Sequence, residues 1–346
     1  MTWRCGALEN QVTFFPDGTI SPCCLIHSNY KKPVTELFND PFADIRNGEP
    51  PAACEICHDN ERNNHESLRQ GFKLHNDTKY RYLDIRNFNS CNMKCRICGP
   101  MLSSLWGQEL GYENYLQKQD ISPYLEQLIN EDLKQVYYTG GEPMLNPDHW
   151  KLLDLIIERK LNKNIRLQYN TNGTIIKYKD KDIINIWKHF REVHLMVSVD
   201  ATGEEFNILR HGGIWEEVKQ NLLTMKTWPV KLEVAVTVNL LNIWFLKNIF
   251  EELKGFEINL YELNNPSFLS LSAIDERYKQ QALDCLDECS KYIKKNDLDF
   301  YKSRLRNNFN CDQFKNLITH VLLLDKKRNE NLFDKLPFND YTAINL

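Results

Sequence analysis

The sequence predicts an α/β protein: a partial, open TIM-like (β/α)6 barrel with a Cys-rich cluster-binding module before it and a helical subdomain after it. From about residue 79, short β-type runs alternate with amphipathic helical stretches, and the final segment is mostly helical. Strand–helix alternation at this spacing is typical of right-handed βαβ units and a parallel sheet. Because six units are fewer than the eight of a closed barrel, we expect an open version.

These patterns divide the chain into residues 1–75, 76–271 and 272–346. The six expected strands share β-type runs bounded by turn residues: Tyr82–Arg86, Gln135–Tyr138, Ile165–Tyr169, Val193–Val199, Leu232–Val238 and Glu257–Tyr261. Amphipathic helical patterns lie between them near residues 102–117, 148–160, 179–190, 213–225 and 243–254.

Composition narrows the class of protein. The 346 residues carry a net charge of −4, which gives no basic stripe for nucleic acid. No apolar run approaches the length that crosses a bilayer, and the first residues lack the apolar stretch of a signal peptide. We therefore expect a cytoplasmic protein without membrane or nucleic-acid partners. Disulfides are rare in that compartment, so metal or cluster ligation is the leading explanation for eleven cysteines, eight of them in the first hundred residues.

The first 75 residues are irregular and rich in Cys, Pro and Asn, with a turn at Pro16-Asp17-Gly18 between two short β-like runs. Such a segment has little apolar periodicity with which to build a core. A bound metal could supply the missing stabilisation.

A cysteine motif follows the first barrel strand, with Cys91, Cys95 and Cys98 spaced C-x3-C-x2-C. Three thiolates can bind three irons of a 4Fe–4S cluster and leave the fourth iron without a protein ligand, although they also suit zinc with a distant fourth ligand. The motif resembles the radical S-adenosylmethionine (SAM) superfamily signature C-x3-C-x-aromatic-C, with Ile97 in place of the aromatic residue. The resemblance implies a SAM-binding 4Fe–4S cluster whose cysteines carry the chemistry.

The second strand is followed by Gly140-Gly141-Glu142-Pro143. Two glycines allow a ligand to approach the backbone closely, and a carboxylate can pair with an ammonium group. The string resembles the superfamily's GGE motif, which implies that Glu142 holds the amino group of SAM. Taken alone, it also reads as a turn with a helix-starting proline.

Polar residues at the later strand ends complete the expected SAM site. By resemblance, Asn172, Ser198, Asp200 and Asn239 lie where superfamily members contact SAM, and Arg210 pairs with its carboxylate through a planar guanidinium. Alternation places Ser198 and Asp200 on one face of their strand. The alternatives are a strand-ending turn at Asn172, strand caps at Ser198 and Asp200, and a surface ion pair at Arg210.

Four cysteines of the N-terminal segment, Cys5, Cys23, Cys54 and Cys57, resemble the ligands of the auxiliary iron–sulfur modules called SPASM and twitch, here placed before the barrel. The resemblance implies a second cluster. Cys24 could replace Cys23, and four cysteines also suit structural zinc. Of the remaining cysteines, two at helical spacing, Cys285 and Cys289, read as core residues. Cys311 could be a buried structural thiol, a further ligand or a hydrogen-atom donor.

The resemblance implies an enzyme that cleaves SAM to a 5′-deoxyadenosyl radical and abstracts hydrogen from a substrate. An auxiliary cluster that accepts the substrate electron favours net oxidation, and peptides or proteins are the expected substrates. An electron donor such as flavodoxin or ferredoxin is the expected partner. The alternatives are oxidation or rearrangement of a small polar metabolite, such as a sugar or nucleoside derivative, and a non-catalytic zinc-binding adaptor.

Overall fold

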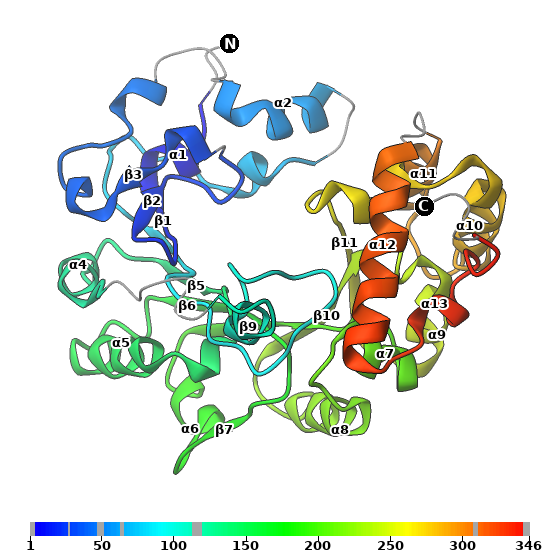
Figure 1. Ribbon diagram of the computed structural model, residues 1–346. Helices are drawn as coiled ribbons and strands as arrows, with labels where there is room; N and C mark the ends of the chain where they lie inside the picture. Colours follow the sequence, from blue (N-terminus) through cyan, green and yellow to red (C-terminus); the bar gives the residue numbers. More distant parts are fainter. Residues whose placement is uncertain are drawn as a thin grey trace.

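The computed structural model of the protein describes residues 4–26, 28–46, 52–62, 66–112, 120–306 and 311–341. Within them, nine strands form one sheet in the order β11-β10-β9-β6-β5-β4-β1-β2-β3 (Figure 1). Their bounds are β1 (Gln11–Phe14), β2 (Thr19–Ser21), β3 (Lys32–Pro33), β4 (Tyr82–Ile85), β5 (Gln135–Tyr138), β6 (Arg166–Thr171), β9 (Glu192–Ser198), β10 (Lys231–Val238) and β11 (Glu257–Glu262). A separate antiparallel pair joins β7 (Lys177–Tyr178) to β8 (Lys181–Asp182).

The six predicted barrel strands are confirmed as β4, β5, β6, β9, β10 and β11, and every neighbouring pair among them is parallel. The sheet is an open arc, since β11 and β3 are its two edges and do not pair with each other. This agrees with the expected partial barrel. Because the strands are parallel, their carboxyl ends meet at one rim of the sheet, where the active sites of α/β barrels lie.

The helices between the strands are α3 (Ser104–Glu109), α4 (Ser122–Leu128), α5 (Pro147–Glu158), α6 (Ile183–Trp187), α7 (Gly203–Leu209), α8 (Trp215–Met225) and α9 (Leu246–Glu252). The sequence patterns missed α4 and α7, because each spans only about two turns and shows little periodicity. In the predicted helix near 102–117, residues 113–117 lie outside the described residues. Single 3₁₀ turns occupy Ser28–Tyr30, Val34–Glu36, Ala43–Ile45, Ala52–Cys54, Leu68–Gly71, Pro143–Leu145, Ile243–Phe245, Ser267–Leu269 and Leu271–Ala273.

The N-terminal segment is more ordered than its sequence pattern indicates. It contains α1 (Gly6–Asn10) and α2 (Glu55–Arg62), and strand β1 pairs in parallel with β4, with Val12 opposite Leu83. The expected turn joins β1 to β2, and Val12, Phe14 and Ile20 are buried. Strands β1 and β2 are too short to show a periodic pattern in the sequence. Pairing with the barrel sheet gives them the hydrogen-bond partners that the sequence does not reveal. The segment therefore extends the barrel sheet, while the domain boundary near residue 75 stays a prediction.

The predicted C-terminal helical region is confirmed, with helices α10 (Glu276–Glu288), α11 (Lys295–Leu305), α12 (Cys311–Arg328) and α13 (Leu332–Lys335). The longest, α12, buries one apolar face made by Phe314, Leu317, Ile318 and Val321. These residues follow helical spacing, so a single stripe of α12 faces the protein. No helix among the described residues has both the length and the apolar character to cross a membrane.

The two faces of the sheet differ in chemistry. Alternate side chains such as Leu167, Tyr169, Leu195 and Val197 are buried on one face, and helices α5, α6 and α8 lie on the outside of the arc (Figure 1). Among the alternate residues of the same strands, Arg166, Gln168 and Ser198 are polar and partly exposed, whereas His194 and Met196 are buried. This alternation is what a sheet covered by helices on its convex side requires.

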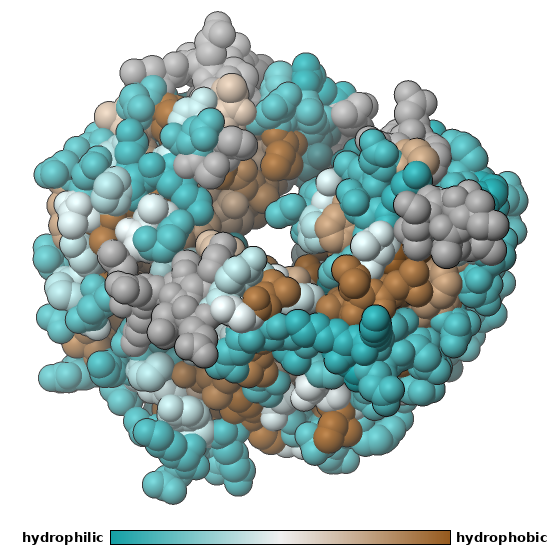
Figure 2. Space-filling view, in the orientation of Figure 1, coloured by the Kyte–Doolittle hydropathy of each residue, from teal (hydrophilic) through white to brown (hydrophobic). Residues whose placement is uncertain are grey.

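The concave face carries a row of hydrogen bonds that crosses five strands. Gln135 donates to the Gln168 side chain (3.1 Å), Arg166 contacts His194 (3.0 Å), and Tyr261 donates to Glu233 (2.7 Å). A contact of 2.8 Å between His194 Nε2 and Glu233 joins these groups. The space-filling view shows an opening between the N-terminal segment and the C-terminal helices (Figure 2).

Candidate functional site

The loop that follows β4 carries Cys91, Cys95 and Cys98; we call residues 87–99 the cluster loop. The Cys98 amide donates to the Cys95 carbonyl (3.0 Å), which forms a tight turn between the two thiols. A hydrogen bond from the Cys98 thiol lowers the pKa of Cys95 to about 7 and raises that of Cys98. Burial raises the pKa of Cys91 to about 12. Three thiols within eight residues form a donor set that suits an iron–sulfur cluster.

Gly140 and Gly141 contact the cluster loop itself. The Gly141 amide donates to the Phe88 carbonyl (3.1 Å), and the next amide, of Glu142, donates to the Ser90 carbonyl (2.8 Å). A Cβ atom on Gly141 would lie 2.1 Å from the Ser90 oxygen, so no other residue fits here without displacing the loop. The glycine at position 141 is therefore required by the close approach of the cluster loop, whether or not a ligand also binds there.

Glu142 presents a fully buried carboxylate beside the cluster loop. It accepts hydrogen bonds from the Thr171 hydroxyl (2.8 Å), the Asn172 amide (2.8 Å) and the Met144 amide (3.3 Å). All three donors are neutral, and burial raises the pKa of Glu142 to about 7. Each carboxylate oxygen can accept two hydrogen bonds, so a cationic donor could still bind and would offset the cost of burial.

Asn172 connects this carboxylate to the cysteines. Its side-chain amide donates to Asn92 of the cluster loop (2.8 Å) and lies 4.0 Å from the Cys91 sulfur. The expected turn is also present, since the Asn172 side-chain oxygen accepts from the Thr174 amide (2.9 Å). The residue therefore forms the turn and contacts the cluster loop at once.

Asp200 and Arg210 form an ion pair that is buried, not the surface pair considered as an alternative. Arg210 Nη1 donates to Asp200 at 2.6 Å, and the Thr237 amide donates to the other oxygen of Asp200 (3.1 Å). The positive charge of the guanidinium reaches the cluster cysteines: it contributes to the lowered pKa of Cys95 and partly offsets the rise in the pKa of Cys98. Its Nε is buried and has no hydrogen-bond partner among the described residues.

The other two expected SAM contacts differ in character. Ser198 ends β9, half-buried and aligned with Ala235 of β10. Asn239 is fully buried; its side chain donates to the Thr237 carbonyl (2.7 Å) and accepts from the Leu241 amide (2.8 Å). These bonds give Asn239 a turn-forming role, and a ligand contact stays a prediction at both residues.

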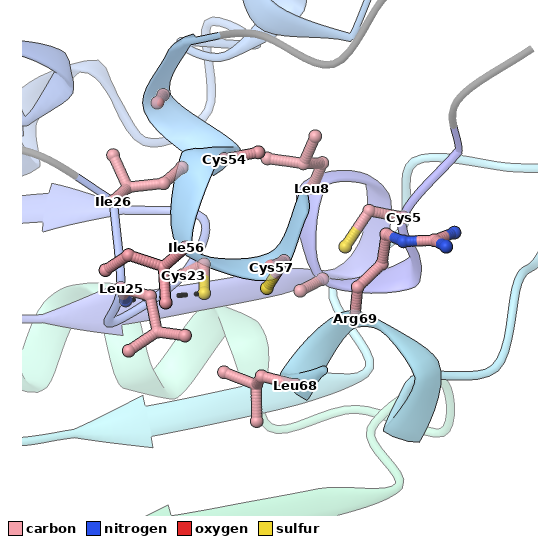
Figure 3. Close-up of a pocket in the computed structure, with 12 residues that line it drawn as sticks. Cys5, Leu8, Cys23, Leu25, Ile26, Cys54, Ile56, Cys57, Leu68 and Arg69 are labelled. Carbon is pink, nitrogen blue, oxygen red and sulfur yellow. Dashed lines mark hydrogen bonds between the residues drawn. The ribbon is translucent and has the colours of Figure 1, made fainter. Parts of the chain in front are cut away.

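The four N-terminal cysteines named as ligands line one pocket (Figure 3): Cys5, Cys23, Cys54 and Cys57. They come from the start of α1, the loop after β2 and the start of α2, and the cavity between them is about 20 Å³, room for one water-sized occupant. Cys24 does not line this pocket. A hydrogen bond with the Cys23 thiol lowers the pKa of Cys24, which also lies near the Asp84–Arg86 ion pair.

Over the ranges that the structure describes, no group of three or more His, Cys, Asp or Glu side chains is arranged to hold a metal ion. The structure thus gathers the four N-terminal cysteines, and the metal role of these and of the three cluster-loop cysteines stays a prediction. Cys289 is buried and Cys285 half-buried, whereas Cys311 is exposed at the first residue of α12. The buried structural reading of Cys311 is therefore wrong.

Arg96 is a site residue that the sequence analysis missed. It lies between Cys95 and Cys98, is fully buried, and forms ion pairs with Asp325 and with Glu330, the latter at 2.6 Å. Within the motif it occupies a position where any residue is allowed, so no local signal distinguishes it. Only the position of the C-terminal helix identifies its partners.

The open parallel barrel thus carries three thiols and a buried carboxylate at the carboxyl ends of its strands, where the active sites of α/β barrels lie. Residues 87–241 match the family model of the radical SAM superfamily.

Curated relatives include GTP 3′,8-cyclase of Campylobacter lari, 31% identical over 102 residues (30% of each chain), and that of Helicobacter pylori, 32% identical over 108 residues (30% of this chain and 31% of the other). The match spans less than a third of the length of these relatives. Solved structures with a similar fold include anSMEcpe with bound AdoMet (19% identity, TM-score 0.44, 61% of this chain and 59% of the other). Another is Streptococcus suis SuiB bound to precursor peptide SuiA (13% identity, TM-score 0.38, 84% and 65%).

Proposed function

We propose that this protein is a radical SAM enzyme that abstracts hydrogen from a peptide or protein substrate, for net oxidation. When bound at Cys91, Cys95 and Cys98, a 4Fe–4S cluster supplies one electron to SAM, which releases a 5′-deoxyadenosyl radical. The observation that carries the proposal is the fully buried Glu142 carboxylate beside the cluster loop, surrounded by neutral donors.

In this proposal the chain's own residues bind and orient SAM. Glu142 binds the ammonium group, whose positive charge compensates the buried carboxylate. Arg210 offers its unpartnered Nε to the carboxylate of SAM while Asp200 holds the guanidinium in place. Asn172 and Ser198 lie at neighbouring strand ends, where they can contact the ribose.

The four thiols of Cys5, Cys23, Cys54 and Cys57 are proposed to hold a second iron–sulfur cluster, which would accept the substrate electron after hydrogen loss; the pocket of about 20 Å³ would have to widen to admit it. Structural zinc is the alternative occupant, because four thiols also suit tetrahedral zinc. A metal count distinguishes the two.

The open, polar concave face supports a peptide or protein as the substrate. Small-molecule sites enclose most of the surface of their ligand, whereas Figure 2 shows an opening between the N-terminal segment and the C-terminal helices. An extended chain can enter such an opening and hydrogen-bond to the row that includes Gln168 and Glu233.

A small polar metabolite, such as a nucleoside derivative, is the second candidate. It is favoured by the similarity of about 30% of the chain to proteins named GTP 3′,8-cyclase. Incubation of the reduced enzyme and SAM with GTP and, separately, with cell peptide extracts, followed by mass spectrometry, distinguishes the candidates. Net loss of two hydrogens from a peptide supports the first, and a modified nucleotide supports the second.

The experiment that tests the core of the proposal is anaerobic purification and reconstitution, then counting of iron and zinc and incubation with SAM and dithionite. We expect about eight irons per chain for two four-iron clusters, and 5′-deoxyadenosine that is lost when Cys91, Cys95 and Cys98 are replaced by Ala. About four irons plus one zinc would keep the radical chemistry and make the N-terminal site structural. Zinc alone without SAM cleavage would overturn the proposal and favour a zinc-binding adaptor.

A matched pair of variants tests the role of Glu142. Glu142→Gln removes the carboxylate charge and is expected to weaken SAM binding about 10- to 100-fold, because a charge-assisted hydrogen bond is lost. The exposed Glu158→Gln is the control, with unchanged affinity. Equal SAM affinity in both variants, measured by equilibrium dialysis, would remove Glu142 from the site.

A further inference from the structure

A groove of about 590 Å³ lies between α3 and α12, on the outer side of the cluster loop. Of the residues that the structure describes, it is lined by Trp106, Leu110, His320, Leu323, Leu324, Lys326 and Lys327. None of them belongs to the proposed SAM site.

The floor of the groove is bonded directly to the cluster loop. Trp106 Nε1 donates to the Cys95 carbonyl (2.9 Å), and His320 Nε2 donates to the carbonyl of the next residue, Arg96 (2.9 Å). The two rings are stacked, 15° from parallel with centroids 6.4 Å apart. A partner seated in the groove is therefore one aromatic side chain away from the backbone of a cluster cysteine.

α3 is also fixed to the same loop from its first turn. The Ser103 hydroxyl donates to the Met93 carbonyl (2.6 Å) and accepts from the Trp106 amide (3.4 Å), so it fixes the start of the helix to the loop. The floor of the groove and the cluster loop thus form one rigid unit.

The walls of the groove are apolar and its rim is basic. Leu110 and Leu323 are 45% and 62% exposed, unusually high values for leucine, and Lys326 and Lys327 are both exposed. The Lys327 amino group donates to the carbonyl of Glu109, a neutral acceptor, so its charge is retained.

The acidic side chains of this region are already paired with other cations. Glu109 pairs with Lys94 and Arg328, both at 2.7 Å, and Asp325 and Glu330 pair with Arg96. The groove therefore presents exposed leucines under a positive rim.

We propose that this groove is the docking site of an acidic flavin protein that delivers one electron to the cluster. The inference rests on the proposed function, which requires a one-electron reductant. A flavin carrier with an exposed apolar ring edge surrounded by carboxylates matches the apolar walls and the lysine rim, and opposite charges accelerate its encounter with the groove. The flavin loses one electron and the cluster gains it, and no bond is made or broken.

Binding of a flavodoxin to the full chain tests the proposal without relying on turnover. Affinity is measured by calorimetry at low and high salt for the native protein, for the double variant Lys326→Glu, Lys327→Glu, and for Leu323→Asn. We expect about tenfold weaker binding in both variants, and a salt dependence that is lost in the lysine variant. The control is Lys160→Glu, Lys163→Glu, two exposed lysines in the turn before the amino end of β6, with unchanged affinity.

Circular dichroism and thermal unfolding verify that each variant is folded, which the exposure of all the replaced residues favours. Equal affinity of the native protein and the lysine variant would overturn the docking site. Binding of a ferredoxin but not of a flavodoxin would overturn the flavin partner.

Reduction assays separate this inference from the proposed function. In the lysine variant, 5′-deoxyadenosine formation driven by reduced flavodoxin falls, while formation driven by dithionite, a small reductant that needs no docking, stays at the native rate. Failure of the native protein to form 5′-deoxyadenosine with dithionite contradicts the proposed function, whatever the binding experiment shows.

Discussion

Arg96, in the middle of the cluster loop, is ion-paired to Glu330 at 2.6 Å across 234 residues of chain. Glu330 also contacts His211 at 2.5 Å, and the backbone around His211 accepts from the Lys94 amide at 2.7 Å. The residues that follow α12 thus hold the cluster loop against the α7–α8 connection. The C-terminal region is part of the support of the candidate active site.

Arg96→Met should therefore destabilise the whole protein. Removal of the guanidinium leaves the buried Asp325 without its cation and Glu330 with only its His211 contact, and breaking one partner of a buried pair costs about 3–5 kcal/mol. Urea unfolding measures the free energy. The control is Lys247→Met, which breaks the exposed pair with Glu288 and should cost less than about 1 kcal/mol. Similar losses in the two variants would contradict the role of Arg96.

Gly141→Ala should displace the cluster loop. The added methyl group would lie 2.1 Å from the Ser90 carbonyl oxygen, and overpacking of this kind costs about 1–3 kcal/mol. We expect lower thermal stability and less iron retained after reconstitution. Gly99→Ala, in the same loop but with no atom within 4 Å of the new methyl group, should leave both unchanged. Normal iron retention in Gly141→Ala would refute the close approach of the two loops.

Cys23, and not Cys24, should be required for metal at the N-terminal pocket. Cys23 lines the pocket with the other three cysteines, whereas Cys24 lies near the Asp84–Arg86 pair. In a background where the three cluster-loop cysteines are replaced by Ala, Cys23→Ala should lose the remaining metal and Cys24→Ala should keep it. Mass spectrometry of bound metal gives the count, and the opposite pattern would exchange the two assignments.

The free energy of unfolding should decrease as the pH is lowered, because the buried His149 resists protonation. Burial lowers its pKa from 6.5 to about 3, and its Nε2 lies 2.9 Å from the Tyr169 hydroxyl. The folded pKa is depressed, so the unfolded chain binds the proton first; the stabilisation is present above pH 6.5 and is lost as pH falls toward 3. The slope is at most about 1.4 kcal/mol per pH unit for one proton.

The measurement is urea unfolding between pH 7.5 and 5, compared with His149→Gln, which cannot titrate. The native protein should lose about 1–2 kcal/mol more than this variant over that range. Replacement of the exposed His189 by Gln should leave the native slope intact. Parallel slopes in the native protein and His149→Gln would show that His149 does not control the effect.

The barrel strands and the cysteine motif could be predicted because their signals are local. Short β-type runs bounded by turn residues identify β4, β5, β6, β9, β10 and β11, and parallel pairing then places Glu142, Asn172 and Asp200 at one rim. The spacing of Cys91, Cys95 and Cys98 names the donor set without any knowledge of the fold. A period or a spacing depends only on residues that are close in the chain.

The tertiary structure alone decided which distant residues meet. It pairs β1 with β4, sets Gly141 against Ser90, places Cys23 but not Cys24 in the lining of the N-terminal pocket, and buries Arg96 between two carboxylates of the C-terminal region. Each of these contacts joins segments that are far apart in the chain, and such contacts leave no local pattern in the sequence. Packing of the whole sheet and its helices determines these contacts. A buried charge is tolerated only where another segment supplies an opposite charge. A glycine is required where another segment comes too close for a side chain.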